Sequence, residues 1–184
     1  GKLNGMFIRY IGYRDNVGQK SYEGNYKDGK YDGKWTFWDY KDGWKEKEEN
    51  YKDGTRHGKE TEWDKSGLKL WEGNFKDGKR DGLIKLYSES GRKKKEFYYK
   101  QGVEISSKEF SWHENGKQKS EINFKGDKKD GLSTRWFDNG QKKEEGNYKG
   151  DKKDGVSTYF LENGSLFRHQ TWHENVLISS SMPG

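Results

Sequence analysis

Apolar and polar residues alternate with a period of two along much of the chain, which predicts β-strands. In one such stretch, Leu132, Thr134 and Trp136 would share one face of a strand, and Ser133 and Arg135 would share the other. We therefore expect sheets whose faces carry different side chains.

In the strand that would pair with such a stretch in a hairpin, a glycine often stands two positions before an aromatic residue. Gly146 and Tyr148, for example, would lie on one face of their strand, with Glu145 and Asn147 on the other. Because glycine has no side chain, we expect Gly146 to leave room for a ring from the neighbouring strand.

The strand pattern recurs every 24 to 25 residues, which is typical of a repeat protein. One register of the repeat is aromatic and consists of Tyr26, Tyr51, Phe75, Tyr99, Phe124 and Tyr148. A second aromatic register consists of Trp38, Trp63, Tyr87, Trp112, Trp136 and Phe160. The two registers together would form an aromatic ladder in which rings pack on rings across strands and replace an aliphatic core.

The repeat predicts an all-β fold of tandem β-hairpins, arranged as an elongated, twisted, antiparallel single-layer meander. We expect one repeat domain over residues 1–184. It would consist of a partial or capping unit at 1–18, six repeats at 19–164, and a C-terminal cap or tail at 165–184.

Glycine-containing turns should close both ends of every hairpin. Asn139-Gly140 and Asn163-Gly164 are strong signals for tight hairpin turns. The Lys-Asp-Gly-Lys-x-Asp-Gly segments, such as residues 76–82, would form the longer return connections.

Composition supports the strand prediction and narrows the function. The chain has 25 Gly, 8 Trp, 12 Tyr and 9 Phe but no alanine, which argues against helices and also against disorder. Without cysteine it can form no disulfide, no thiolate metal site and no thiol nucleophile. No apolar run is long enough to span a bilayer and no signal peptide is recognisable, but the compartment stays open.

The repeated pattern resembles a known family. Glu-Gly-Asn-Tyr-Lys-Asp-Gly-Lys-x-Asp-Gly followed by Thr-x-Trp-x-x-Asn-Gly is similar to the bacterial variant of the MORN repeat, as found in the YwqK-type antitoxin family. The similarity extends from about Gly18 to Gly164, with a departure at Val103 to Lys108, where the Asp-Gly return is missing. It implies a binding or immunity role, and for MORN repeats generally a protein-interacting or phospholipid-binding role.

Four aromatic residues stand outside the shared registers and are our candidates for a contact patch. Trp35 and Phe37 occupy positions where other repeats carry charged or small polar residues, and Trp44 and Trp71 are likewise irregular. Large rings at non-repeating positions are typical anchors of protein interfaces.

The sequence gives little support for metal binding or catalysis. The Asp pairs of the returns, such as Asp28 and Asp32, lack EF-hand spacing and are better explained by turn formation. His169 and His173 would lie about 13 Å apart on a strand, too far for one metal ion. No nucleophile, zinc or phosphate-binding motif occurs, so we expect no enzyme, no metal and no cofactor.

The sequence therefore predicts a non-catalytic module that binds a protein partner, with a toxin as the partner that the family resemblance implies. A glycan, a membrane lipid or a purely structural surface role are alternatives. Nucleic acid is an improbable partner because only Arg92 to Lys95 forms a purely basic run in a chain of net charge +6. The oligomeric state is left open.

Overall fold

The computed structural model describes residues 1–13 and 16–184, and this part of the chain contains strands and turns but no helix. The predicted all-β fold of hairpins is confirmed. The strands are β1 (Gly5–Tyr13), β2 (Asn16–Lys27), β3 (Lys30–Trp38), β4 (Lys45–Lys52), β5 (Thr55–Arg56), β6 (Gly58–Trp63), β7 (Lys69–Lys76), β8 (Lys79–Arg80), β9 (Gly82–Tyr87), β10 (Lys93–Lys100), β11 (Val103–Trp112), β12 (Gln118–Lys125), β13 (Lys128–Trp136), β14 (Lys142–Lys149), β15 (Lys152–Phe160), β16 (Leu166–His173) and β17 (Val176–Ser181).

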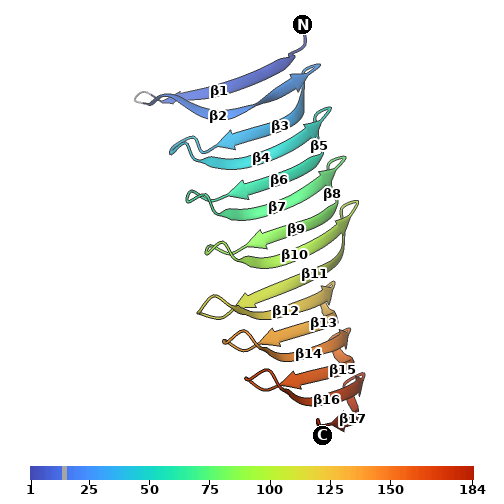
Figure 1. Ribbon diagram of the computed structural model, residues 1–184. Helices are drawn as coiled ribbons and strands as arrows, with labels where there is room; N and C mark the ends of the chain where they lie inside the picture. The colour runs from blue at the N-terminus through green and yellow to red at the C-terminus, as the bar shows by residue number, and fades with distance from the viewer. Residues whose placement is uncertain (14–15) are drawn as a thin grey trace. The chain divides into compact units, whose positions relative to one another are not determined.

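The chain divides into two compact units. Unit 1 comprises Gly1–Lys93 and Tyr98–Val103, and unit 2 comprises Lys94–Phe97 and Glu104–Gly184. Within each unit the strands form an antiparallel meander in chain order, β1 to β9 in unit 1 and β11 to β17 in unit 2 (Figure 1). Whether residues 1–184 form a single repeat domain stays a prediction.

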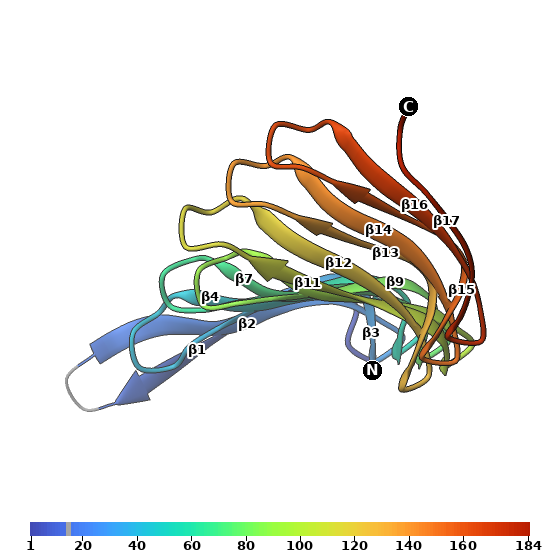
Figure 2. The ribbon, with the colours of Figure 1, turned by 90° about the horizontal axis from the view of Figure 1, so that it is seen from below.

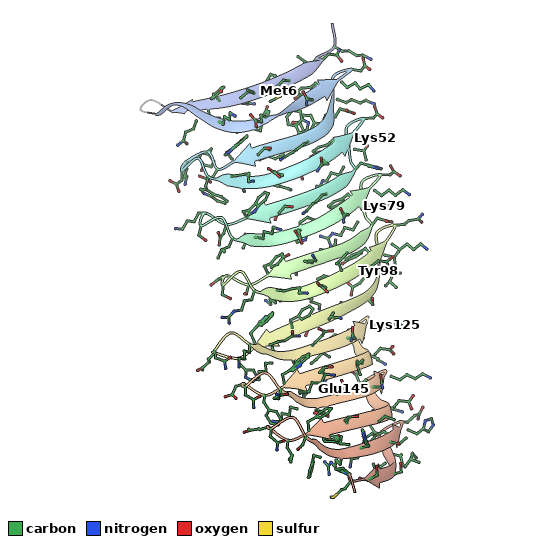
Figure 3. All side chains as sticks on the ribbon, in the orientation of Figure 1. Met6, Lys52, Lys79, Tyr98, Lys125 and Glu145 are labelled. Atoms are coloured by element: carbon green, nitrogen blue, oxygen red, sulfur yellow. The ribbon has the colours of Figure 1, made fainter. Side chains whose placement is uncertain are left out.

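Cross-strand pairing assigns the side chains of each unit to two faces. We call face A the side that holds Trp35 in unit 1 and its equivalent Ser133 in unit 2. Face B is the opposite side, which holds Thr36 in unit 1 and Thr134 in unit 2. Side chains project from the sheet (Figure 3), and among residues 1–13 and 16–184 no helix or second sheet covers either face of a unit.

Trp35 is the centre of unit 1. It has no exposed surface, its ring stacks on Tyr31 with 3.7 Å between centroids, and its indole N–H donates to the Asn25 carbonyl at 3.1 Å. The ring lies directly on Gly24 of the neighbouring strand, where an added Cβ would come within 2.2 Å of it. Glycine at this position is thus what allows a tryptophan to be buried in a single sheet.

The expectation that a ring from the neighbouring strand lies over Gly146 in unit 2 is wrong. The group that lies over Gly146 is the Ser157 hydroxyl, 2.7 Å from an ideal Cβ position, and not a ring. Ser157 is fully buried, so a small polar side chain fills the space that Trp35 fills in unit 1. The backbone geometry is shared, but the side chain at the centre of the repeat differs.

The two kinds of turn have the reverse of the expected lengths. The return turn is the tight one: Lys27 pairs with Lys30, and Asp28 and Gly29 both have positive φ, 52° and 79°, as a type I′ turn requires. The second Asp-Gly of the segment lies inside β3 at a register shift. Only glycine readily adopts the φ of 76° found at Gly33 in this shift.

The front turns, at the other end of the hairpins, are longer than predicted. The N–H of Phe137 donates to the carbonyl of Gln141, which leaves a three-residue loop ending in Gly140 with φ of 91°. This is the loop in which a turn is completed by a residue of left-handed conformation. The Asn-Gly pair therefore forms the last two residues of the loop and not a two-residue turn.

A bulge follows the front turn in β4, β7, β12, β14 and β16, and it explains the Lys-x-x-Glu spacing of β4, β7 and β14. In β4, Phe37 pairs with Lys47 and Trp38 with Lys45, which leaves Glu46 unpaired. The extra residue brings Lys45 and Glu48 to the same face, 3.2 Å apart, although they are three positions apart in a strand. The strands are bent as well as twisted, which is evident when unit 2 is viewed from below (Figure 2).

Candidate functional site

Face A of unit 1 carries a row of large side chains on successive strands. Tyr22 pairs with Phe37, Phe37 with Lys47, Lys47 with Glu62, and Glu62 with Trp71. All of these side chains are half-buried. The row thus presents aromatic rings at both ends and an ion pair between them, with 3.3 Å from Lys47 Nζ to the Glu62 carboxylate.

A cluster of buried charges lies beside this row. Lys47 Nζ is 2.7 Å from the carboxylate of Glu49 and 3.0 Å from that of Glu60, and these two glutamates are only 5% and 4% exposed. Arg56 contacts Glu60 at 3.3 Å, and the Tyr51 hydroxyl donates to Glu49 at 2.6 Å. The cluster is self-compensating, because every buried carboxylate has a cationic or hydroxyl partner.

Burial and pairing shift the titration of this cluster in definite directions. Burial raises the pKa of Glu60, since it disfavours the charged form more than Lys47 stabilises it. Burial would lower the pKa of Lys47, but hydrogen bonds to Glu49 and Glu60 reverse this and raise it. Burial also raises the pKa of Tyr31 to about 12. Near neutral pH, Lys47 and Tyr31 therefore keep their protons.

The structure places the four candidate aromatic residues in three different environments. Phe37 and Trp71 lie in the face A row, but Trp35, whose ring lies beside that of Phe37 on the same face, is fully buried and cannot contact a partner directly. Trp44 is half-buried in the front turn between β3 and β4, where its carbonyl accepts from the Asp39 N–H at 2.9 Å. Only Phe37 and Trp71 belong to one surface, and their role in binding stays a prediction.

The two aromatic registers lie on opposite faces. The register of Tyr26, Tyr51, Phe75, Tyr99, Phe124 and Tyr148 is on face A, and the register of Trp38, Trp63, Tyr87, Trp112, Trp136 and Phe160 is on face B. Tyr31, which belongs to neither register, packs between Tyr26 and Tyr51, with its ring centroid 5.2 Å from that of each.

Elsewhere a cation from the intervening strand lies against the ring. On face A, Arg56 lies 5.1 Å from the Phe75 centroid, and Lys129 lies 5.6 Å from that of Tyr148. On face B, Lys45 lies 4.0 Å from the Trp63 centroid. Cation–π contacts thus connect successive hairpins where the sequence predicts direct ring stacking.

Acidic and histidine residues do not assemble a metal site. The second Asp of a return accepts a backbone N–H, as Asp81 does from Gln101 at 3.0 Å. His173 contacts Asp154 at 3.1 Å, and His169 contacts the Thr158 hydroxyl at 3.1 Å. Among residues 1–13 and 16–184, no group of three or more His, Asp or Glu side chains is arranged to hold a metal ion.

Sequence reasoning missed the buried charges of Lys47, Glu49 and Glu60. Their signal was the repeat itself: Glu60 occupies the central face A position that Trp35 and Ser157 occupy in other hairpins, and all three are buried. A charged residue at a buried position requires a partner, and alternation along the facing strand places Glu49 and Lys47 on the same side.

Two hairpins of unit 2 contain the residues that match a known family of repeats. Each of two successive hairpins, β11 with β12 and β13 with β14, consists of two antiparallel strands around a front turn with glycine. Residues 108–125 and 129–149 match the MORN repeat variant. Each match spans most of one hairpin, so the MORN repeat corresponds to the structural repeat.

MORN repeats are generally non-catalytic modules that bind proteins or lipids. No curated protein matches the chain. No helix in the described ranges is long and apolar enough to cross a membrane.

Proposed function

We propose that this protein is a non-catalytic MORN-type repeat module that binds a partner protein through face A of unit 1. The observation that carries the proposal is the row Tyr22, Phe37, Lys47, Glu62 and Trp71, which combines half-buried rings with an ion pair. Aromatic anchors next to charged groups that set orientation are typical of protein interfaces.

Support for a rigid binding surface comes from the residues that pack beside the row on face A. Trp35 is fully buried and contacts Tyr22 and Phe37, with centroids 5.9 and 6.4 Å away. Lys47 is held by Glu49 and Glu60. Side chains that are fixed before binding lose little conformational entropy when a partner docks, which favours affinity.

The finer proposal is an antitoxin or immunity-type role, in which face A masks a toxin by steric occlusion. It rests on the family resemblance of the repeats, and the face A row is the surface that would do the masking. Identification of a captured partner as a toxin would support it, and a captured partner without toxic activity would contradict it.

The test is affinity capture from source lysate by wild type and by the Phe37→Ser/Trp71→Ser variant. Loss of two interface anchors should lower the affinity by at least about a hundredfold, since each anchor contributes about 2 kcal/mol. The measurement is the dissociation constant for the captured partner, with circular dichroism to establish that the variant is folded.

The matched control removes two side chains of unit 1 from face B. Leu83 and Tyr98 are 41% and 49% exposed, so Leu83→Ser/Tyr98→Ser removes comparable apolar surface. We expect this control to bind as wild type does. Equal affinity of wild type and the Phe37→Ser/Trp71→Ser variant would contradict the proposal.

A further inference from the structure

Unit 2 has a hollow of about 580 Å³ on face A, beside the front turns. Ser111, Ser120, Ile122 and Arg135 line it from face A, together with Trp136 at the end of β13 and residues of the turns and bulges. This volume lies within the range of small-molecule sites, which is about 300 to 1,000 Å³. The hollow lies entirely within unit 2, and is separate from the row of rings in unit 1.

The hollow results from an exchange of large side chains for small ones. Ser111 pairs with Ser120 at the position of the repeat where unit 1 has Phe37 paired with Lys47. The pair that follows in unit 2 is again large, Arg135 with Glu144. Two serine side chains occupy far less volume than these pairs, so the surface is hollowed at this hairpin.

Polar groups converge on the hollow. The Ser111 and Ser120 hydroxyls form a hydrogen bond of 2.6 Å with each other, and Arg135 on the adjacent strand pairs with Ser120 across the sheet. The hydroxyl of Ser133 is buried without a partner among the described residues, and lines a small adjoining cavity together with Ile122 and Arg135.

Two further cations reach the hollow because of the bulges after the front turns. Lys119 and Lys143 are the unpaired residues of the bulges in β12 and β14, and both line the hollow. Within residues 1–13 and 16–184, neither ammonium group lies within 4 Å of a carboxylate, whereas Arg135 is 3.6 Å from Glu144. Unpaired cations with hydroxyl donors nearby favour an anionic ligand.

The rest of the lining restricts the size and charge of that ligand. Ile122 and Phe137 supply apolar surface, and Lys143 Nζ lies 5.2 Å from the centroid of the Phe137 ring. Asp138 and Glu162 line the hollow from the turns, and would repel a long polyanion. A small molecule with one anionic group and an apolar remainder fits both features.

We propose that this hollow binds a small organic anion, with its carboxylate or phosphate held by Arg135, Lys119 and Lys143. Its apolar part lies against Ile122 and Phe137. One hydroxyl of the Ser111–Ser120 pair donates to the other, and the hydrogen of the second hydroxyl donates to the anionic group. The site does not depend on the partner-binding face of unit 1.

Isothermal titration calorimetry with benzoate, phenyl phosphate and the neutral benzyl alcohol tests this proposal. We expect benzoate or phenyl phosphate to bind with an affinity at least about tenfold above that of benzyl alcohol. The tighter of the two anions identifies the preferred anionic group. Absence of binding by both anions up to about 10 mM, or equal binding of benzyl alcohol, would overturn the proposal.

Variants of two residues locate the binding site. Ser111→Phe installs the side chain that unit 1 accommodates at the same register, so it should fill the hollow, leave the sheet folded and abolish binding. Arg135→Gln should weaken binding at least about tenfold, and Arg135→Lys should retain part of it. Lys125→Gln, at the return turn of unit 2 (Figure 3), is the control and should bind as wild type. Unchanged binding by the Ser111→Phe variant, with its fold intact, would overturn the assignment to this hollow.

Discussion

At the scale of single residues, the central face A position is buried in four hairpins whose side chains there differ in chemistry. Trp35, Glu60, Ile84 and Ser157 are 0%, 4%, 1% and 0% exposed, although they are aromatic, charged, aliphatic and polar. The sequence made Trp35 a surface candidate because it differs from its counterparts. Its burial depends on Gly24 and on neighbouring rings such as Tyr22, which only the folded structure brings into contact with it.

Replacement of Gly24 by alanine should therefore strongly destabilise unit 1. The new Cβ would lie 2.2 to 2.6 Å from three ring atoms of Trp35, so the ring or the strand must move. We expect the free energy of unfolding to fall by about 3 kcal/mol, the upper part of the range for overpacked cores.

Urea denaturation measures this loss, and Gly12→Ala is the matched control. Nothing lies within 4 Å of a Cβ at Gly12, so the control should change stability by no more than about 1 kcal/mol. A Gly24→Ala protein as stable as the control would contradict the proposed packing of Trp35.

The lowered pKa of Glu72 predicts that the protein loses stability in acid. Burial would raise its pKa, but hydrogen bonds from Lys69, Lys85 and Tyr87 hold the pKa well below the usual 4.5. A carboxyl whose pKa is lowered by folding stabilises the protein above its unfolded pKa. This contribution disappears as the pH falls below about 4.5.

The expected result is that Glu72→Gln is less stable than wild type at neutral pH and loses less stability on acidification. Thermal unfolding at about pH 7, 5 and 3 measures both effects. Glu46→Gln removes an exposed carboxyl from a bulge of the same unit, and should follow wild type at each pH. Parallel pH profiles of wild type and Glu72→Gln would refute the pKa assignment.

At the scale of elements, the sequence predicted the hairpins but not the form of their turns. Asp28-Gly29 and Asp32-Gly33 are the same dipeptide, yet the first is a tight turn and the second lies within a strand. Local preference alone cannot separate these outcomes, because both conformations require residues that tolerate positive φ. Pairing with the preceding strand decides between them.

The front turns of unit 2 are joined by asparagine side chains. Asn139 Oδ1 accepts from the Gln141 N–H at 2.8 Å, and its Nδ2 donates to the Glu162 carbonyl of the next front turn at 2.7 Å. Asn163 Oδ1 accepts from both the N–H and the hydroxyl of Ser165, at 2.9 and 2.7 Å, and among the described residues its amide contacts no other turn. Asn139 therefore stabilises both its own turn and the next.

Asn139→Asp keeps the oxygen that accepts from Gln141 but loses the donor to Glu162, so it should cost about 1 kcal/mol, the net value of one hydrogen bond. Asn163→Asp is the matched control, because the Asn163 oxygen accepts from Ser165 and its amide N–H group contacts no other turn among the described residues. Urea denaturation of the two variants gives the difference directly, and equal losses of stability would mean that the contact between turns contributes nothing in solution.

At the scale of the whole molecule, the two units use the same hairpin with different face A side chains. Unit 1 has rings and a compensated charge cluster on this face, whereas unit 2 has a hollow lined by serines and cations. The repeat period was evident in the sequence. Both sites lie where the residues depart from the repeat. The sequence named Phe37 and Trp71 as candidates, but only cross-strand pairing assigns them to one row, and it is this pairing that locates the hollow.

The central functional claim is that face A of unit 1 contacts the partner. Hydroxyl-radical footprinting of the captured complex tests it most directly, because this method reports the solvent access of individual side chains. We predict protection of Tyr22, Phe37 and Trp71 on binding, with no change at Tyr98 on face B. Protection of Tyr98 with unchanged labelling of Phe37 and Trp71 would contradict the account.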